Sequence, residues 1–203
     1  MTLAVALPSA DMAVGSLYWA LPHGLRVLLL VYFATWVALI VHETGHGLSA
    51  RLLGVRIWGI SLGRGPTLWR GMINGVHMRL ALFPLHGEIR FLDPDAVRLG
   101  YEDARTGGDR FEWHRGSSWR APLISAAGTF GNLVAAQAVR IYWSSAHRPS
   151  LPVFMISLTV FLVNAFMLLN LIPIRGSDGR RIAVQAAAWR KRSTTESTAE
   201  TTR

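Results

Sequence analysis

The chain has 203 residues, of which 51% are hydrophobic and 16% charged, and its formal net charge is +9. Together with a mean hydropathy of +0.29, this balance is too apolar for an ordinary soluble domain and favours a membrane protein. The chain has no cysteine, which excludes disulfides and thiolate ligands, so any metal ion must be bound by histidine and carboxylate side chains.

The basic residues are distributed as in a membrane protein. The N-terminal segment, residues 1–24, has no Lys or Arg and so lacks the basic region of a cleaved signal peptide, and we expect it to be retained. Arginines are concentrated in residues 54–120 and again after Pro173. They lack a nucleic-acid-binding motif, so no nucleic acid is expected as a partner. The positive-inside rule predicts an N-terminus outside and a cytoplasmic C-terminus.

Three apolar windows are long enough to cross a bilayer, whose hydrocarbon core needs about 20 mostly apolar residues. We predict helices at about residues 25–53, 121–143 and 151–172. Residues 121–139 and the whole third window carry no charge, whereas the first window continues through two histidines and a glutamate. Three crossings agree with ends on opposite sides of the membrane.

The sequence HETGH, at residues 42–46, lies in the first window. On a helix, His42 and His46 lie on the same face one turn apart and can bind one metal ion. Glu43 lies beside that face and can take a proton from a water at the metal, as in the zinc metalloprotease pattern. The alternative is a polar helix end at the membrane surface. A charge at the centre of a span costs about 2.5–3.5 kcal/mol, which favours a functional cluster.

A catalytic zinc usually has three protein ligands, so two histidines are an incomplete site. The two soluble patterns do not supply the third. Ser49 and Leu52 stand where the long-form pattern has Gly and His, and the next acidic residue after Glu43 is Glu88.

Asp178 is a better candidate for the third ligand. It lies in NLIPIRGSDGRR, residues 170–181, where Pro173 ends or kinks the third helix. Irregular backbone at membrane depth is tolerated where it lines a water-filled cavity, so a carboxylate here can fold back toward the first helix. The alternative is an interfacial loop with Asp178 paired to a neighbouring arginine.

The region between the first two windows, about residues 54–92, is predicted to form β-strands. Residues 55–62 and 76–83 are rich in β-branched and aromatic side chains, and the second segment alternates apolar and polar positions. An edge strand here could hold an extended substrate by β-addition. The alternative is a sheet that only braces the helices.

Three separated motifs resemble the site-2 protease family of intramembrane zinc metalloproteases. They are HETGH at 42–46, AAGTFGN at 126–132, and Asn170-x-x-Pro173 followed by Asp178-Gly179. The segments GISLGRGPTLW (59–69) and RLALFPLHGEIRF (79–91) are similar to a loop of the bacterial sigma-E-regulating branch. The resemblance covers roughly residues 25–180.

The resemblance implies one Zn²⁺ per chain, with His42, His46 and Asp178 as its ligands. It implies that Glu43 is the catalytic general base and acid.

Gly128 and Asn132 match the second-helix motif of the family and Asn170 matches its third-helix motif. The resemblance implies contact with substrate or with the oxyanion, and helix packing is the alternative for all three. Thr129 and Ser177 depart from a proline and a leucine that are common in the family, which affects helix geometry and not the ligand chemistry.

The sequence thus predicts an α-helical membrane protein with a three-transmembrane-helix metalloprotease core and a small β-sheet. The expected parts are the N-terminal segment 1–24, the core 25–180, and a cytoplasmic amphipathic helix with a disordered tail, 181–203. A PDZ module, which relatives of this branch often carry, does not fit in residues 93–120.

The predicted function is zinc-dependent cleavage of a single-span membrane protein, such as an anti-sigma factor or a signal-peptide remnant. Membrane lipid and a regulatory membrane partner are expected. An excess of arginine over lysine is typical of a GC-rich bacterial genome. The expected location is therefore the bacterial cytoplasmic membrane. The first alternative is a catalytically silent membrane scaffold that retains the fold. A zinc transporter is a weaker alternative, because no further intramembrane ligands are visible.

Overall fold

The computed structural model describes residues 19–91, 120–145, 149–187 and 190. The expectations for the N-terminal segment, for the space available to a PDZ module and for the tail fall mainly on residues outside these ranges. The described elements are α2 (His23–Leu52), β1 (Ile57–Ile73), β2 (Val76–Phe91), α4 (Arg120–Ser144), α5 (Leu151–Phe166) and the 3₁₀ helix η2 (Met167–Leu171).

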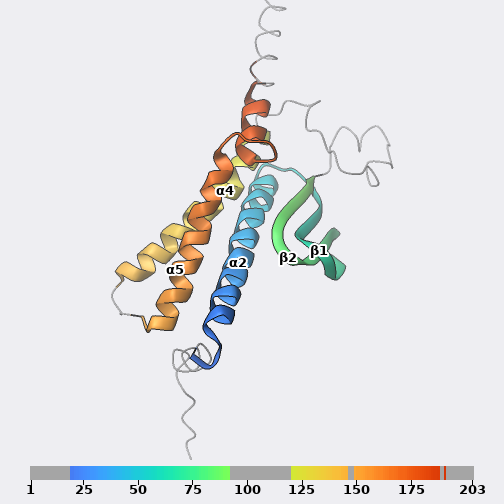
Figure 1. Ribbon diagram of the computed structural model, residues 1–203. Helices are drawn as coiled ribbons and strands as arrows, with labels where there is room; N and C mark the ends of the chain where they lie inside the picture. The colour runs from blue at the N-terminus through green and yellow to red at the C-terminus, as the bar shows by residue number, and fades with distance from the viewer. Residues whose placement is uncertain (1–18, 92–119, 146–148, 188–189, 191–203) are drawn as a thin grey trace, which may run out of the picture.

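Helix α2 is the central element of the fold. It lies between the β-sheet on one side and the pair α4 and α5 on the other (Figure 1). The first apolar window is therefore in contact with every other layer, which places the HETGH segment where helices and sheet meet.

Two of the helices are long and apolar enough to cross a membrane, His23–Leu52 and Leu151–Leu171. The window at 121–143 is helical as predicted, and its 25 residues would extend about 37 Å at 1.5 Å per residue. Its mean hydropathy is lower than that of the other two helices, because its sequence is rich in alanine, glycine and polar residues.

The buried side chains of the helices are mostly small or polar, and large apolar side chains point outward. Ala34, Ala38 and Ala50 of α2 are nearly fully buried, whereas Leu28 and Phe33 of the same helix are 65% and 61% exposed. Lipid tails are as apolar as leucine, so large side chains facing outward and small ones between helices are typical of membrane bundles.

Glycines bring α2 and α4 into close contact. A Cβ at Gly45 would overlap the backbone of Ala127, and one at Gly131 would lie 3.1 Å from the carbonyl oxygen of Val41. The two backbones therefore approach more closely than larger residues allow, and short side chains of α4 can reach groups on α2.

The third helix ends before Pro173, as the proline predicts. Helix α5 tightens into η2, Ile172 is extended, and Gly176 has a φ of 91°. The backbone N–H of Arg180 then donates to the hydroxyl of Ser177 at 3.2 Å, and a new helical stretch runs from residue 178 to at least 187. This helix starts earlier than the predicted amphipathic helix, and its first residue is Asp178.

The β region forms a sheet of two long antiparallel strands rather than the short strands predicted. Asn74 and Gly75, with φ of 49° and 78°, form the tight turn between them. Residues 59–62 of β1 pair with two parts of β2, residues 77–80 and residues 87–90. Strand β2 therefore curves around this part of β1.

The sheet is attached to α2 through Tyr32. Its hydroxyl donates to the backbone carbonyl of Leu82, in the middle of β2, at 2.8 Å. A Cβ at Gly63 of β1 would lie 3.1 Å from the Trp36 ring, so β1 also lies close against α2. These contacts fix the distance between the strands and the helix that carries HETGH.

Replacing Tyr32 by Phe should loosen the sheet. Loss of a hydrogen bond worth about 0.5–1.5 kcal/mol predicts roughly two- to tenfold faster amide exchange in β1 and β2, with α4 unchanged. Hydrogen exchange measured by mass spectrometry in detergent checks this, and Tyr142→Phe, on an exposed side chain of α4, is the control. Equal exchange in the two variants would contradict the assigned role.

Candidate metal centre

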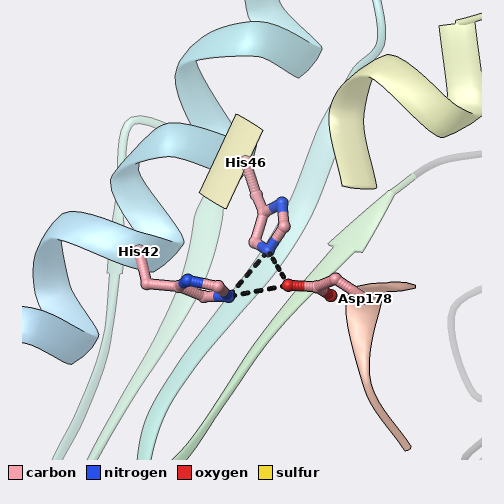
Figure 2. Close-up of side chains that lie close together, drawn as sticks. All are labelled: His42, His46 and Asp178. Carbon is pink, nitrogen blue, oxygen red and sulfur yellow. Dashed lines mark hydrogen bonds and ion pairs between the residues drawn. The ribbon is translucent and has the colours of Figure 1, made fainter. Parts of the chain in front are cut away.

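Two imidazoles and one carboxylate converge in a buried space. His42 Nε2 lies 3.1 Å from His46 Nε2 and 3.0 Å from Asp178 Oδ2, and His46 Nε2 lies 3.5 Å from the same oxygen. The rings come from successive turns of α2 and the carboxylate approaches from the segment after η2 (Figure 2). All three residues are buried.

Hydrogen bonds behind the rings fix their orientation. His42 Nδ1 lies 2.7 Å from Asn132 Oδ1, and His46 Nδ1 lies 2.6 Å from the carbonyl oxygen of Ile124. Both partner atoms are acceptors, so both rings donate from Nδ1. In its neutral form each ring then directs an unprotonated Nε2 toward the other ring and toward Asp178.

Three lone-pair-bearing atoms that face one another repel unless a proton or a cation lies among them. Nitrogens bound to zinc at about 2.0–2.1 Å in tetrahedral geometry lie roughly 3.3 Å apart. The three separations here, 3.0, 3.1 and 3.5 Å, bracket that value. Two neutral imidazoles and a carboxylate also form a common ligand set of catalytic zinc, so the residues present fit the ion.

The carboxylate of Asp178 is held by its own neighbours. Asn170 Nδ2 donates to Oδ2 at 2.6 Å, and Arg181 Nη1 lies 3.6 Å from Oδ1. Metal binding needs the ionised form of this carboxylate. The N–H of Asn170 and the guanidinium of Arg181 both stabilise that form.

Glu43 lies beside the three converging groups and lines a cavity of about 890 Å³. The cavity is bounded by α2, by residues 85–91 of β2 and by the segment from Phe166 to Gln185. A Cβ at Gly87 would overlap the Glu43 carboxylate, so the β2 backbone lies directly against it. The carboxylate thus lies between the β2 backbone and the cavity.

Glycine also makes room for the second imidazole. A Cβ at Gly128 of α4 would overlap the ring of His46. Gly128 does not line the cavity, so its observed contact is with a predicted ligand.

The three asparagines of the site differ in what they can reach. Asn170 lines the cavity, and its Nδ2 lies 3.5 Å from His42 Nε2. Asn132 is fully buried behind His42 and does not line the cavity. Asn164, also fully buried, accepts a hydrogen bond from Asn132 at 2.9 Å. Sequence reasoning did not single out Asn164, although an amide in an uncharged, mostly apolar helix is the signal that could have found it.

Residues 30–148 of the chain match Peptidase family M50. The chain belongs to this family, the site-2 proteases. The match includes HETGH and the Gly128–Asn132 segment, and it ends before Asp178. The position of Asp178 at the site therefore rests on the geometry described above.

Proteins similar to this chain are named as metalloproteases or proteases. The chain is 35% identical over 95 residues to a Campylobacter jejuni protein named as a zinc metalloprotease, covering 47% of this chain and 25% of that protein. It is 35% identical over 111 residues to the regulator of sigma-E protease RseP of Salmonella typhimurium, covering 54% of this chain and 23% of RseP. The chain thus spans about a quarter of the length of these relatives.

Family membership and geometry agree at a coarse level. The site-2 proteases are membrane-embedded metalloproteases, and two helices among the described residues are apolar enough to cross a membrane. A His-His-Asp group able to hold a metal ion lies where one of these helices meets the segment after the other.

Replacing Gly87 by Ala should separate the Glu43 carboxylate from the metal ligands. The added methyl group displaces that carboxylate. With Glu43 in its predicted role of general base, cleavage of a model transmembrane substrate should then fall by about 10²–10⁴-fold. Zinc content should stay unchanged in the same preparation. The control is Gly24→Ala, where a Cβ meets nothing within 4 Å. Full activity of Gly87→Ala would show that β2 does not constrain Glu43.

Replacing Asp178 by Ala tests the third ligand. Loss of a hydrogen-bond partner of a metal ligand lowers metal affinity by about 10–100-fold. Loss of a ligand itself should lower zinc affinity by more than that. Competition with a chelator measures this on detergent-purified protein. Glu88→Ala removes a partly exposed carboxylate that pairs with Arg90 and should leave zinc affinity unchanged. Wild-type affinity in Asp178→Ala would remove this residue from the ligand set.

Proposed function

We propose that this chain is a zinc-dependent intramembrane endopeptidase that cleaves a single-span membrane protein in or near its transmembrane segment. The observation that carries the proposal is the convergence of His42, His46 and Asp178 beside the Glu43 carboxylate. The residues lie in or next to helices that are apolar enough to cross a membrane. Membership of the site-2 protease family supports the same chemistry.

Each residue has a distinct part in this proposal. Zinc, when bound by His42, His46 and Asp178, polarises the scissile carbonyl and makes water a stronger acid. Glu43 takes the proton from the attacking water and later gives it to the leaving amine. Asn170, which lines the cavity and bonds Asp178, is placed to donate to the carbonyl oxygen as negative charge develops on it.

The cavity suggests how substrate is held. One wall is the end of β2, residues 87–91, which among the described pairings joins β1 on one side only. The lining also includes apolar side chains from the end of α5 to the residue after η2, such as Phe166, Leu169 and Ile172. A peptide that adds to the free edge would be extended, and its carbonyls would be open to attack. The alternative, a sheet that only braces the helices, predicts no backbone contact with substrate.

The proposed membrane arrangement has three crossings. Helix α2 and the α5–η2 segment are long and apolar enough to cross a membrane. Helix α4 packs against both α2 and α5, so we place it across the membrane as well. In this arrangement the N-terminus lies outside and the C-terminus in the cytoplasm, and residues 25–180 form the protease core. Similarity to a relative named as a regulator of sigma-E protease supports a bacterial anti-sigma factor as one substrate class.

The second candidate is a catalytically silent scaffold that retains the fold. Intact ligands and the buried Glu43 favour the enzyme, because a scaffold has no use for a carboxylate placed in a cavity beside a metal site.

The comparison of wild type with Glu43→Gln tests the proposal. Wild-type protein purified in detergent should contain one zinc per chain and cut a model transmembrane substrate. Glu43→Gln should keep the zinc and cut about 10²–10⁴-fold more slowly, because the amide cannot accept the proton. Stoichiometric zinc without cleavage of any of several single-span substrates would favour the scaffold instead.

A further inference from the structure

Asn132 of α4 joins three helices through one amide group. Its Nδ2 donates to the carbonyl oxygen of Ala38 on α2 and to Asn164 Oδ1 on α5, each at 2.9 Å. Its Oδ1 accepts from His42 Nδ1 at 2.7 Å. Both N–H groups are used, and the residue has no exposed surface. The amide therefore has no donor left for a substrate carbonyl.

The direction of this amide decides which nitrogen of His42 is protonated. With Oδ1 toward the ring, Nδ1 must carry the proton and Nε2 is left with its lone pair. If the amide were turned over, its N–H would face Nδ1. The neutral ring would then be protonated at Nε2, which could not bind a metal ion.

Asn164 holds the amide in the productive direction together with the carbonyl oxygen of Ala38. Its Nδ2 donates to the carbonyl oxygen of Val160 in its own helix at 2.8 Å, so its Oδ1 is directed at Asn132. An acceptor at this point requires the N–H side of the Asn132 amide. Asn164 is fully buried in a helix without charged residues, where an amide is costly unless its hydrogen bonds are made.

We infer that Asn132 and Asn164 are positioning residues that act in series on His42, so that the third helix sets the protonated nitrogen of a ligand on the first. This inference rests on the proposed zinc site. It assigns Asn132 to ligand orientation in place of substrate contact, and it leaves Asn170 as the asparagine that faces the cavity. Asn164 has this role without touching the metal position.

A general packing role for Asn164 can be separated from this one. Another hydrogen bond joins α4 and α5 away from the site, from Trp143 Nε1 to the hydroxyl of Ser157 at 2.9 Å. Ser157→Ala therefore removes an interhelical bond of the same helix pair without affecting His42. A residue that only packs helices would behave like Ser157.

The test measures zinc affinity by chelator competition, and the absorption spectrum of the cobalt-substituted protein, for the full chain in detergent. Asn132→Leu should weaken zinc binding by about 10–100-fold, and Asn164→Leu by about tenfold, with an altered cobalt spectrum. Because the residues act in series, the double variant should bind no more weakly than Asn132→Leu alone. Asn164→Asp should restore affinity, since a buried neutral carboxyl keeps the acceptor and can donate to Val160. Ser157→Ala should lower thermal stability and leave zinc affinity and the spectrum unchanged.

Several outcomes would overturn the inference. One is a zinc affinity and cobalt spectrum in Asn164→Leu that match the wild type. Another is a double variant whose loss of zinc affinity equals the sum of the losses in the two single leucine variants. A third is a loss of zinc affinity in Ser157→Ala as large as that in Asn164→Leu. If Asn164→Leu does not fold, Asn164→Ala, which adds no bulk, gives the same comparison. A wild-type protein that binds no zinc would instead defeat the proposed function and this inference together. Bound zinc with an unaffected Asn164→Leu defeats only the inference.

Discussion

Mutual repulsion among three acceptor atoms is the constraint around which the structure is organised. Two imidazole nitrogens and a carboxylate oxygen lie 3.0 to 3.5 Å apart in a buried space, and only a positive charge among them makes that arrangement favourable. A proton on one of the facing nitrogens would relieve the repulsion, but the hydrogen bonds behind the rings keep the ring protons on Nδ1. The site is therefore built to bind a cation, and the zinc chemistry of the site-2 proteases is consistent with it.

The close helix packing serves that constraint. Gly45 and Gly131 bring α2 and α4 together, and Gly128 leaves room for the ring of His46. At this separation a backbone carbonyl of α4 reaches one imidazole and the short Asn132 side chain reaches the other. In a lipid environment small residues at helix contacts cost little, because no hydrophobic effect favours large side chains there.

The polar groups at the site are separated by function. Asn132 and Asn164 are sealed between helices, where their hydrogen bonds are complete. Glu43, Asn170 and Asp178 instead line the cavity. The two buried asparagines thus fix the geometry of the site, and the partly exposed Asn170 is left on the cavity side.

The sequence by itself determined the local features: the helix that carries His42 and His46, the break at Pro173, the strand character of residues 55–62 and 76–83, and the family. These follow from spacing, proline and side-chain periodicity, which act within a few residues. Only the tertiary structure decided that Asp178 faces the histidines, that Asn164 orients His42 through Asn132, and that Gly87 lies against Glu43. Those contacts join residues 32 to 136 positions apart in the sequence, and they depend on helix separations and strand register that no local pattern encodes.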